Sequence, residues 1–216
     1  MRSVNLFAEH MISLIGYEKT GNGSTESGLT VLDNYWKTKF DIHGMHVNDG
    51  SGLSRTNAIS ATNFVALLIE MNKSNNSKAF VNSLPVAGVS GTLRSLCKGQ
   101  TAHNRMHAKS GSMRRIKSYS GYINAISGKK YAFALIVNNH SCSSSTLTRK
   151  MEVVFNTIAA ISLNFSCHYF GPKFFQTSIR STDHFRHNTF FRKSRSCIYF
   201  YDIWNIFDNH EINSGN

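Results

Sequence analysis

Acidic residues are missing from the middle of the chain. No Asp or Glu occurs between Glu70 and Glu152, whereas thirteen Lys and Arg residues fall in that window and the whole chain carries a net charge of +12. Such a segment creates a positive potential that suits carboxylates, phosphates or an anionic polymer. A solvated basic face gives the same pattern, so charge alone does not select a partner.

Long hydrophobic runs are also missing. The longest uninterrupted apolar run, Tyr131 to Val137, is far shorter than the roughly 20 residues that a membrane-spanning helix needs. No heptad, collagen or solenoid repeat is present. With 41% hydrophobic residues in 216, the chain is long enough to bury a sizeable core, and we expect a globular protein without a transmembrane segment.

Cysteine is scarce and unpatterned. Cys97, Cys142, Cys167 and Cys197 match no C-x-x-C spacing, which excludes the common zinc and redox motifs. Cys97 lies near His103 and His107 in the sequence, but a structural zinc site needs a fourth ligand. We therefore expect free thiols, no metal and no cofactor.

Alanine, valine and methionine are absent from residues 162–216, although all thirteen alanines lie before that point and 13 of the 25 aromatic residues lie after it. No helical or strand period organises these aromatics. We interpret residues 162–216 as a tail that is not part of the fold, as a shifted reading frame would produce. The alternative is an aromatic and basic nucleic-acid platform, but six basic and four acidic residues argue against a nucleic-acid partner.

Hydrophobic periodicity predicts helices before and after a small antiparallel sheet. Leu6, Phe7, Met11, Leu14 and Ile15 predict one apolar side of a first helix that ends at Gly16. Further helices are expected over 29–39, 60–71, 78–84 and 145–161, and strands over 105–112, 119–126 and 131–138. Because the short turn at 128–130 joins two strands, it predicts a hairpin, and the fold class is α+β.

The string Lys109-Ser110-Gly111, inside residues 108–112, is the most informative short motif. On a strand edge, the Lys ammonium supplies charge, the hydroxyl donates a hydrogen bond and Gly admits a ligand backbone. Alone, such a string occurs by chance in many proteins and is usually a surface turn.

The motif is accompanied by Ser3-Val4-Asn5, and S-x-N with K-[ST]-G makes up two thirds of the penicillin-recognising serine enzyme signature. Residues 3–10, 49–57, 84–93 and 108–112 follow one another in an order and spacing that closely resemble the D-alanyl-D-alanine carboxypeptidase/endopeptidase family of low-molecular-mass penicillin-binding proteins. The resemblance covers about residues 1–161. It implies a serine β-lactamase/penicillin-binding-protein-like transpeptidase fold, incomplete here, with an antiparallel sheet packed against helices.

The resemblance also implies roles for the two N-terminal site residues. Ser3 would pass a proton toward the leaving amine, and Asn5 would orient the substrate amide and steady the catalytic lysine. The loop 49–57 would be structural, with a contact to the site from Ser51 or Arg55.

The strand residues would bind the substrate. Lys109 and Ser110, the latter replacing the family's usual Thr, would hold the terminal carboxylate of a D-Ala-D-Ala stem peptide of peptidoglycan. Gly111 completes the motif, and the backbone N–H of Ser112 would be an oxyanion-hole donor. β-Lactams bind the full-length relatives, which act at the cell envelope or periplasm; this sequence shows no signal peptide.

The nucleophile motif S-x-x-K is out of place. The family has it before S-x-N, but here the two matching strings, Ser95–Lys98 and Ser127–Lys130, both follow it. We therefore expect residues 1–161 to be the C-terminal part of a serine-type carboxypeptidase domain that is inactive alone. The alternatives are a non-catalytic protein that binds cell-wall peptides and a basic nucleic-acid-binding protein.

Overall fold

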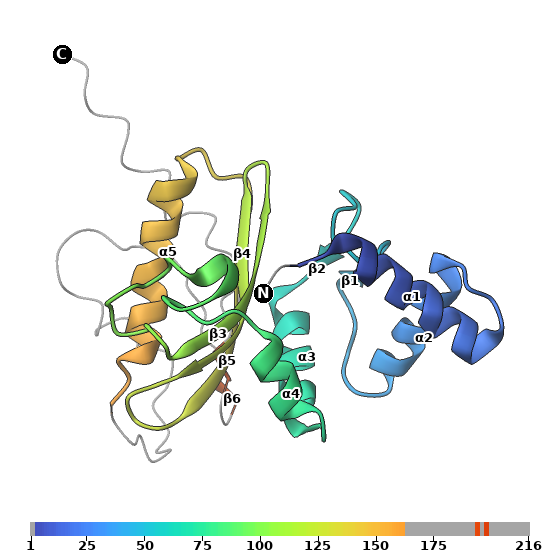
Figure 1. Ribbon diagram of the computed structural model, residues 1–216, viewed down its shortest axis with the longest axis horizontal. Coiled ribbons are helices and arrows are strands. Elements are labelled where there is room, and N and C mark those ends of the chain that lie inside the picture. Colours follow the sequence, from blue (N-terminus) through green and yellow to red (C-terminus); the bar gives the residue numbers. More distant parts are fainter. Residues whose placement is uncertain (1–2, 163–192, 195–196, 199–216) are drawn as a thin grey trace. The chain divides into compact units, whose positions relative to one another are not determined.

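The computed structural model describes residues 3–162, 193–194 and 197–198 (Figure 1). The chain divides into two compact units, Met1–Ser83 and Leu84–Asn216, and each is described by itself. Within the described residues, no helix is both long and apolar enough to cross a membrane.

The N-terminal unit begins with two helices, α1 (Asn5–Thr20) and α2 (Thr25–Lys37). The predicted end of α1 at Gly16 is wrong, because the helix continues to Thr20 and ends at Gly21, whose φ of 75° is left-handed. Gly16 is instead a contact point between the helices: a Cβ there would lie 2.8 Å from the carbonyl oxygen of Asn22 and from the amide nitrogen of Gly28. A glycine within a helix therefore marks close packing here and not a stop signal.

Most of the predicted apolar side of α1 is exposed. Ile12 and Gly16 are the buried residues of the helix, whereas Phe7 is 67% and Leu14 49% exposed. A Cβ at Gly28 of α2 would lie only 2.0 Å from the Ile12 carbonyl oxygen. The backbones of the two helices thus approach closely at Gly28, beside the buried Ile12 side chain.

The rest of the N-terminal unit is a short ribbon and two more helices. Strands β1 (Met45–His46) and β2 (Ala58–Ile59) pair antiparallel. Helix α3 (Ala61–Lys73) begins, as predicted, after Ser60, whose hydroxyl accepts a hydrogen bond from the Asn63 amide at 3.1 Å. Helix α4 (Ser77–Ser83) follows.

The C-terminal unit is built on three antiparallel strands, β3 (Met106–Met113), β4 (Ile116–Asn124) and β5 (Lys130–Val137), in that order across the sheet. A short 3₁₀ helix, η1 (Gly91–Leu93), precedes them. Helix α5 (Ser144–Ala159) follows them and lies along one face of the sheet (Figure 1). The predicted β4–β5 hairpin and the α+β class are confirmed.

Two further strands of two residues each, β6 (Lys193–Ser194) and β7 (Cys197–Ile198), continue the sheet beyond β5, where Ala132 pairs with Cys197 in parallel. The other residues of the predicted tail after Ser162 lie outside the described residues. That 162–216 are foreign to the fold stays a prediction.

The hydrophobic core of the C-terminal unit fills the space between the sheet and α5. Phe155 of α5 is fully buried, and its ring meets Tyr119 edge-on at 5.3 Å and Phe133 at 5.4 Å between centroids. Glu152, on the same helix, accepts a hydrogen bond from the Cys97 amide at 2.7 Å and so ties the turns after η1 to α5. This core holds β3 and its motif in a rigid sheet.

Candidate active site

The S-x-N residues lie at the start of α1. Asn5 is the first residue of the helix, and Ser3 precedes it in extended chain. The N-cap position is held by Val4, which has no side-chain capping bond. Ser3 and Asn5 are both exposed, and within the described residues their side chains form no hydrogen bond, so both polar groups face solvent as a site requires.

A carboxylate on the same helix binds the 49–57 loop. Glu9 accepts the backbone N–H of Gly50 through Oε2 and that of Ser51 through Oε1, both at 3.0 Å. Gly50 packs so closely that a Cβ there would lie 2.5 Å from the Ala8 carbonyl oxygen. Hydrogen bonding from the Ser51 side chain and from the Gly50 backbone lowers the pKa of Glu9. The loop is therefore fixed to the helix that begins at Asn5, two residues after Ser3.

Asp49 stabilises the loop 49–57 through hydrogen bonds to other residues of the same loop. Its carboxylate accepts the backbone N–H of Gly52 at 2.8 Å and of Ser54 at 2.7 Å, and the Asn57 side-chain amide at 2.7 Å. These hydrogen bonds outweigh the opposing effect of burial, and the pKa of Asp49 is lowered. The structural role expected for this loop agrees with these contacts. Glu9 lies within the string 3–10 that carries the resemblance, but sequence reasoning assigned it no role.

The Lys109-Ser110-Gly111 motif lies on β3, an outer strand of the sheet. The segment before η1 covers the start of its outer edge, because the Ala108 amide donates to the Pro85 carbonyl at 3.0 Å. Since backbone groups alternate in direction along a strand, the amides of Ser110 and Ser112 point to the same side as that of Ala108. The Ser112 N–H proposed for the oxyanion hole therefore faces the outer edge.

The side chains of the motif are held by short contacts. Lys109 is exposed, and its Nζ donates to the Ser110 carbonyl at 2.7 Å. The Ser110 hydroxyl donates to Oγ1 of Thr92 in η1 at 2.8 Å, a partner that the motif did not reveal. Gly111 lies beside Ser118 of β4: a Cβ at Gly111 would lie 2.5 Å from the Ser118 hydroxyl, which would have to rotate away. The motif therefore presents an ammonium and a hydroxyl on a preformed strand.

The two halves of the predicted site belong to different units, Ser3 and Asn5 to the first and residues 109–112 to the second. The structure describes each half within its own unit.

Neither S-x-x-K string lies on a helix of the structure. A lysine three residues after a serine faces it when both lie on a helix, but residues 94–99 form turns and Cys97 has a φ of 50°. Ser127 lies in the β4–β5 turn, where its buried hydroxyl has no hydrogen-bond partner among the described residues. The Lys130 ammonium lies over the Tyr122 ring, 5.6 Å from its centroid.

The cysteine–histidine candidates likewise form no metal site. Within the described part of the chain, no three His, Cys, Asp or Glu side chains are placed to hold a metal ion. Burial, with a smaller effect from the Glu152 charge, raises the pKa of Cys97 to about 12. A thiol with such a pKa stays protonated and is a poor metal ligand.

Comparison with solved structures identifies the fold. The chain superposes on a penicillin-binding protein 4 from Haemophilus influenzae, solved in complex with a β-lactam, with a TM-score of 0.67 and 22% identity over 73% of this chain and 39% of that one. A predatory endopeptidase from Bdellovibrio bacteriovorus matches with a TM-score of 0.53 and 19% identity over 71% and 40%. The predicted penicillin-binding-protein-like fold is thus confirmed.

Sequence relatives agree with the fold. A D-alanyl-D-alanine carboxypeptidase from an Actinomadura species is 35% identical over 64% of this chain and 27% of its own length. A penicillin-sensitive carboxypeptidase A from Dictyostelium discoideum is 30% identical over 64% of this chain and 28% of its own length. The chain therefore spans less than a third of these relatives.

The family model that describes the D-Ala-D-Ala carboxypeptidase 3 (S13) family matches residues 1–158. This range includes both motifs, the Asp49 loop, the β3–β5 sheet and nearly all of α5. The resemblance expected from the sequence is confirmed, and the chain belongs to the D-Ala-D-Ala carboxypeptidase 3 (S13) family.

Proposed function

We propose that this chain carries the substrate-binding and proton-transfer half of a serine-type D-Ala-D-Ala carboxypeptidase that acts on peptidoglycan stem peptides at the cell envelope, and that it does not hydrolyse them alone. The observation that carries the proposal is the outer edge of β3, which combines the Lys109 ammonium, the Ser110 hydroxyl and the outward Ser112 amide. Membership of the family supports the substrate class.

The edge of β3 offers complementary groups for a peptide that ends in a carboxylate. The Lys109 ammonium and Ser110 hydroxyl would bind the terminal carboxylate in charge-assisted hydrogen bonds. The Ser112 N–H would donate to the carbonyl oxygen of the scissile bond, where negative charge develops during acyl transfer. Ser3 would deliver a proton to the departing D-Ala amine, with Asn5 orienting the peptide amide.

The acylating step needs a serine that this arrangement does not supply. In the family the S-x-x-K serine attacks the carbonyl, and its lysine activates it. The two strings of that form here are built into turns. Binding without cleavage is therefore the activity expected of these 216 residues.

A fluorescent penicillin tests this proposal, because it labels an acylating serine covalently. We expect no band after denaturing electrophoresis of the purified chain, and weak reversible binding that is lost in Lys109→Ala. A Lys98→Ala variant is the matched control, since it removes one exposed lysine outside the motif and should bind like the parent. A stoichiometric label that disappears in Ser95→Ala would show that Ser95 is the nucleophile and would overturn the proposed lack of hydrolysis.

A further inference from the structure

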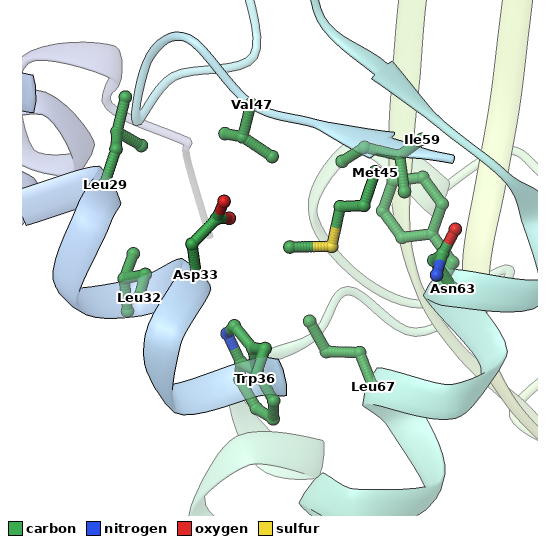
Figure 2. Close-up of a pocket in the computed structure, with 10 residues that line it drawn as sticks. Leu29, Leu32, Asp33, Trp36, Met45, Val47, Ile59, Asn63 and Leu67 are labelled. Atoms are coloured by element: carbon green, nitrogen blue, oxygen red, sulfur yellow. The ribbon is translucent and has the colours of Figure 1, made fainter. Parts of the chain in front are cut away.

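A small apolar cavity lies within the N-terminal unit, between α2, the β1–β2 ribbon and α3 (Figure 2). Its volume is about 140 Å³, close to the roughly 150 Å³ of an apolar cavity that admits benzene. The lining is mostly aliphatic and aromatic, and includes Leu29, Leu32, Trp36, Met45, Ile59 and Leu67.

One charged side chain interrupts this apolar lining. Leu29, Leu32, Asp33 and Trp36 have the i, i+3, i+4, i+7 spacing of one helical face, so Asp33 occupies a position that an amphipathic helix usually gives to an apolar residue. Figure 2 shows its carboxylate directed from α2 into the space beside Leu29, Val47 and Met45. Within the described residues, nothing donates a hydrogen bond or forms an ion pair to it.

The other polar residue of the lining is already engaged. Asn63 is 3% exposed. Its Nδ2 donates to the Asp41 carbonyl at 3.0 Å, and its backbone N–H donates to the Ser60 hydroxyl at 3.1 Å. Asp33 is therefore the group that decides the chemistry of a ligand. A charge on an apolar wall is stabilised by an opposite charge, and Trp36, another lining residue, has the aromatic face best suited to a cation.

We propose that this cavity binds a small organic cation, a primary ammonium group on an apolar body of about benzene size. The ammonium pairs with Asp33, and the apolar body lies among Leu29, Met45 and Leu67. A metal ion does not fit, because a hard cation needs several oxygen ligands and Asp33 is the one carboxylate of the lining. The ligand is opposite in charge to the carboxylate expected at Lys109, so it differs in chemistry from the terminus of the proposed substrate.

Trp36 allows binding to be measured directly. The chain contains two tryptophans, and a Trp204→Phe background leaves Trp36 as the reporter. We expect benzylammonium to cause a saturable change in Trp36 fluorescence. Benzyl alcohol, which has the same ring but no charge, should bind about tenfold more weakly, in the range of a partly exposed ion pair.

Asp33→Asn keeps the shape of the side chain and removes its charge, and should weaken benzylammonium binding about tenfold without changing benzyl alcohol binding. Glu18→Gln, which removes the same charge from the exposed surface of α1, is the control and should bind like the parent. Leu67→Phe should fill the cavity and abolish binding of both compounds, while circular dichroism confirms the fold.

Equal binding of benzylammonium and benzyl alcohol by the parent would overturn the proposal, even if Asp33→Asn failed to fold. Unsaturable titrations with both compounds, or full binding by Leu67→Phe, would also overturn it.

Discussion

The two units of the chain are stabilised in different ways. The C-terminal unit buries large side chains, with Tyr122, Phe133 and Phe155 almost completely removed from solvent. In the N-terminal unit, a Cβ at Gly16, Gly28 or Gly50 would lie less than 3.0 Å from the backbone of another segment, as it would at Gly121 of the C-terminal unit. The Glu9 carboxylate of the N-terminal unit also accepts two backbone amides. A packed core is little affected when a side chain on the surface is removed. A close backbone contact, in contrast, is disrupted by the addition of a single Cβ atom. We infer that the absence of a Cβ at a glycine in close contact can matter as much for stability as the burial of an aromatic ring.

The largest effect should come from the side-chain core. Phe155→Ala removes a fully buried ring that packs against Tyr119 and Phe133, and should lower the free energy of unfolding by about 3–5 kcal/mol. Val153→Ala, on the same helix but 65% exposed, should change it by less than about 0.5 kcal/mol. Urea denaturation measures both, and similar losses for the two variants would contradict the proposed core.

The next effect tests the backbone contacts. Gly28→Ala places a Cβ 2.0 Å from the Ile12 carbonyl oxygen, and should destabilise the α1–α2 pair by about 1–3 kcal/mol through overpacking. Gly23→Ala is the matched control, since its nearest atoms lie 3.8 Å away. Hydrogen exchange should show faster exchange of α1 and α2 amides with β4 and β5 unchanged. Faster exchange throughout would mean that the two units do not differ in this way.

A pH-dependent effect should follow from Glu9. Because hydrogen bonds from Ser51 and Gly50 lower its pKa below the ordinary 4.5, the ionised form stabilises the folded state above that pH, and the stabilisation is lost as the pH falls through the lowered pKa. Glu9→Gln should therefore be less stable than the parent at pH 7, with the difference shrinking toward pH 3. Glu18→Gln serves as the control. A difference that does not depend on pH would contradict the role of the Glu9 charge.

The smallest effect is expected from the tail. Ending the chain at Ile161 removes, of the described residues, Ser162 and the two short strands β6 and β7, of which β7 pairs with β5 at a single position. If residues 162–216 are foreign to the fold, this loss should have little effect on stability. We expect a melting temperature close to that of the parent and equal or better solubility. A drop of about 4 °C or more, which corresponds to roughly 1 kcal/mol, would show that the tail belongs to the fold.

Local signals in the sequence were sufficient for the C-terminal unit. The continuous apolar run from Tyr131 and the short turn before it predicted the β4–β5 hairpin. In the N-terminal unit, Ser60 likewise predicted the start of α3. Each depends on neighbours in the chain, which a sequence shows directly.

Contacts between residues that lie far apart in the sequence could not be predicted. Gly16 resembled a helix end because nothing in the sequence reveals that α2 lies against it. Glu9 binds amides 41 and 42 residues away, and Thr92 meets Ser110 only because η1 packs beside β3. Of the candidate site, the motif residues could be predicted, but the groups that hold them in place could not.

The outer edge of β3 also bears on self-association. Strand edges with free amides and carbonyls invite pairing with a second copy of the chain. The stretch of the β3 edge that could pair with a second copy is short. The Ala108 amide already donates to the Pro85 carbonyl, and the strand ends at Met113. This stretch carries the exposed Lys109, and the exposed Arg114 and Arg115 follow directly after the strand. Two copies that approach edge to edge therefore bring like charges together. The same cations that suit an anionic peptide terminus thereby keep identical edges apart, and that protection should weaken as salt screens the charges.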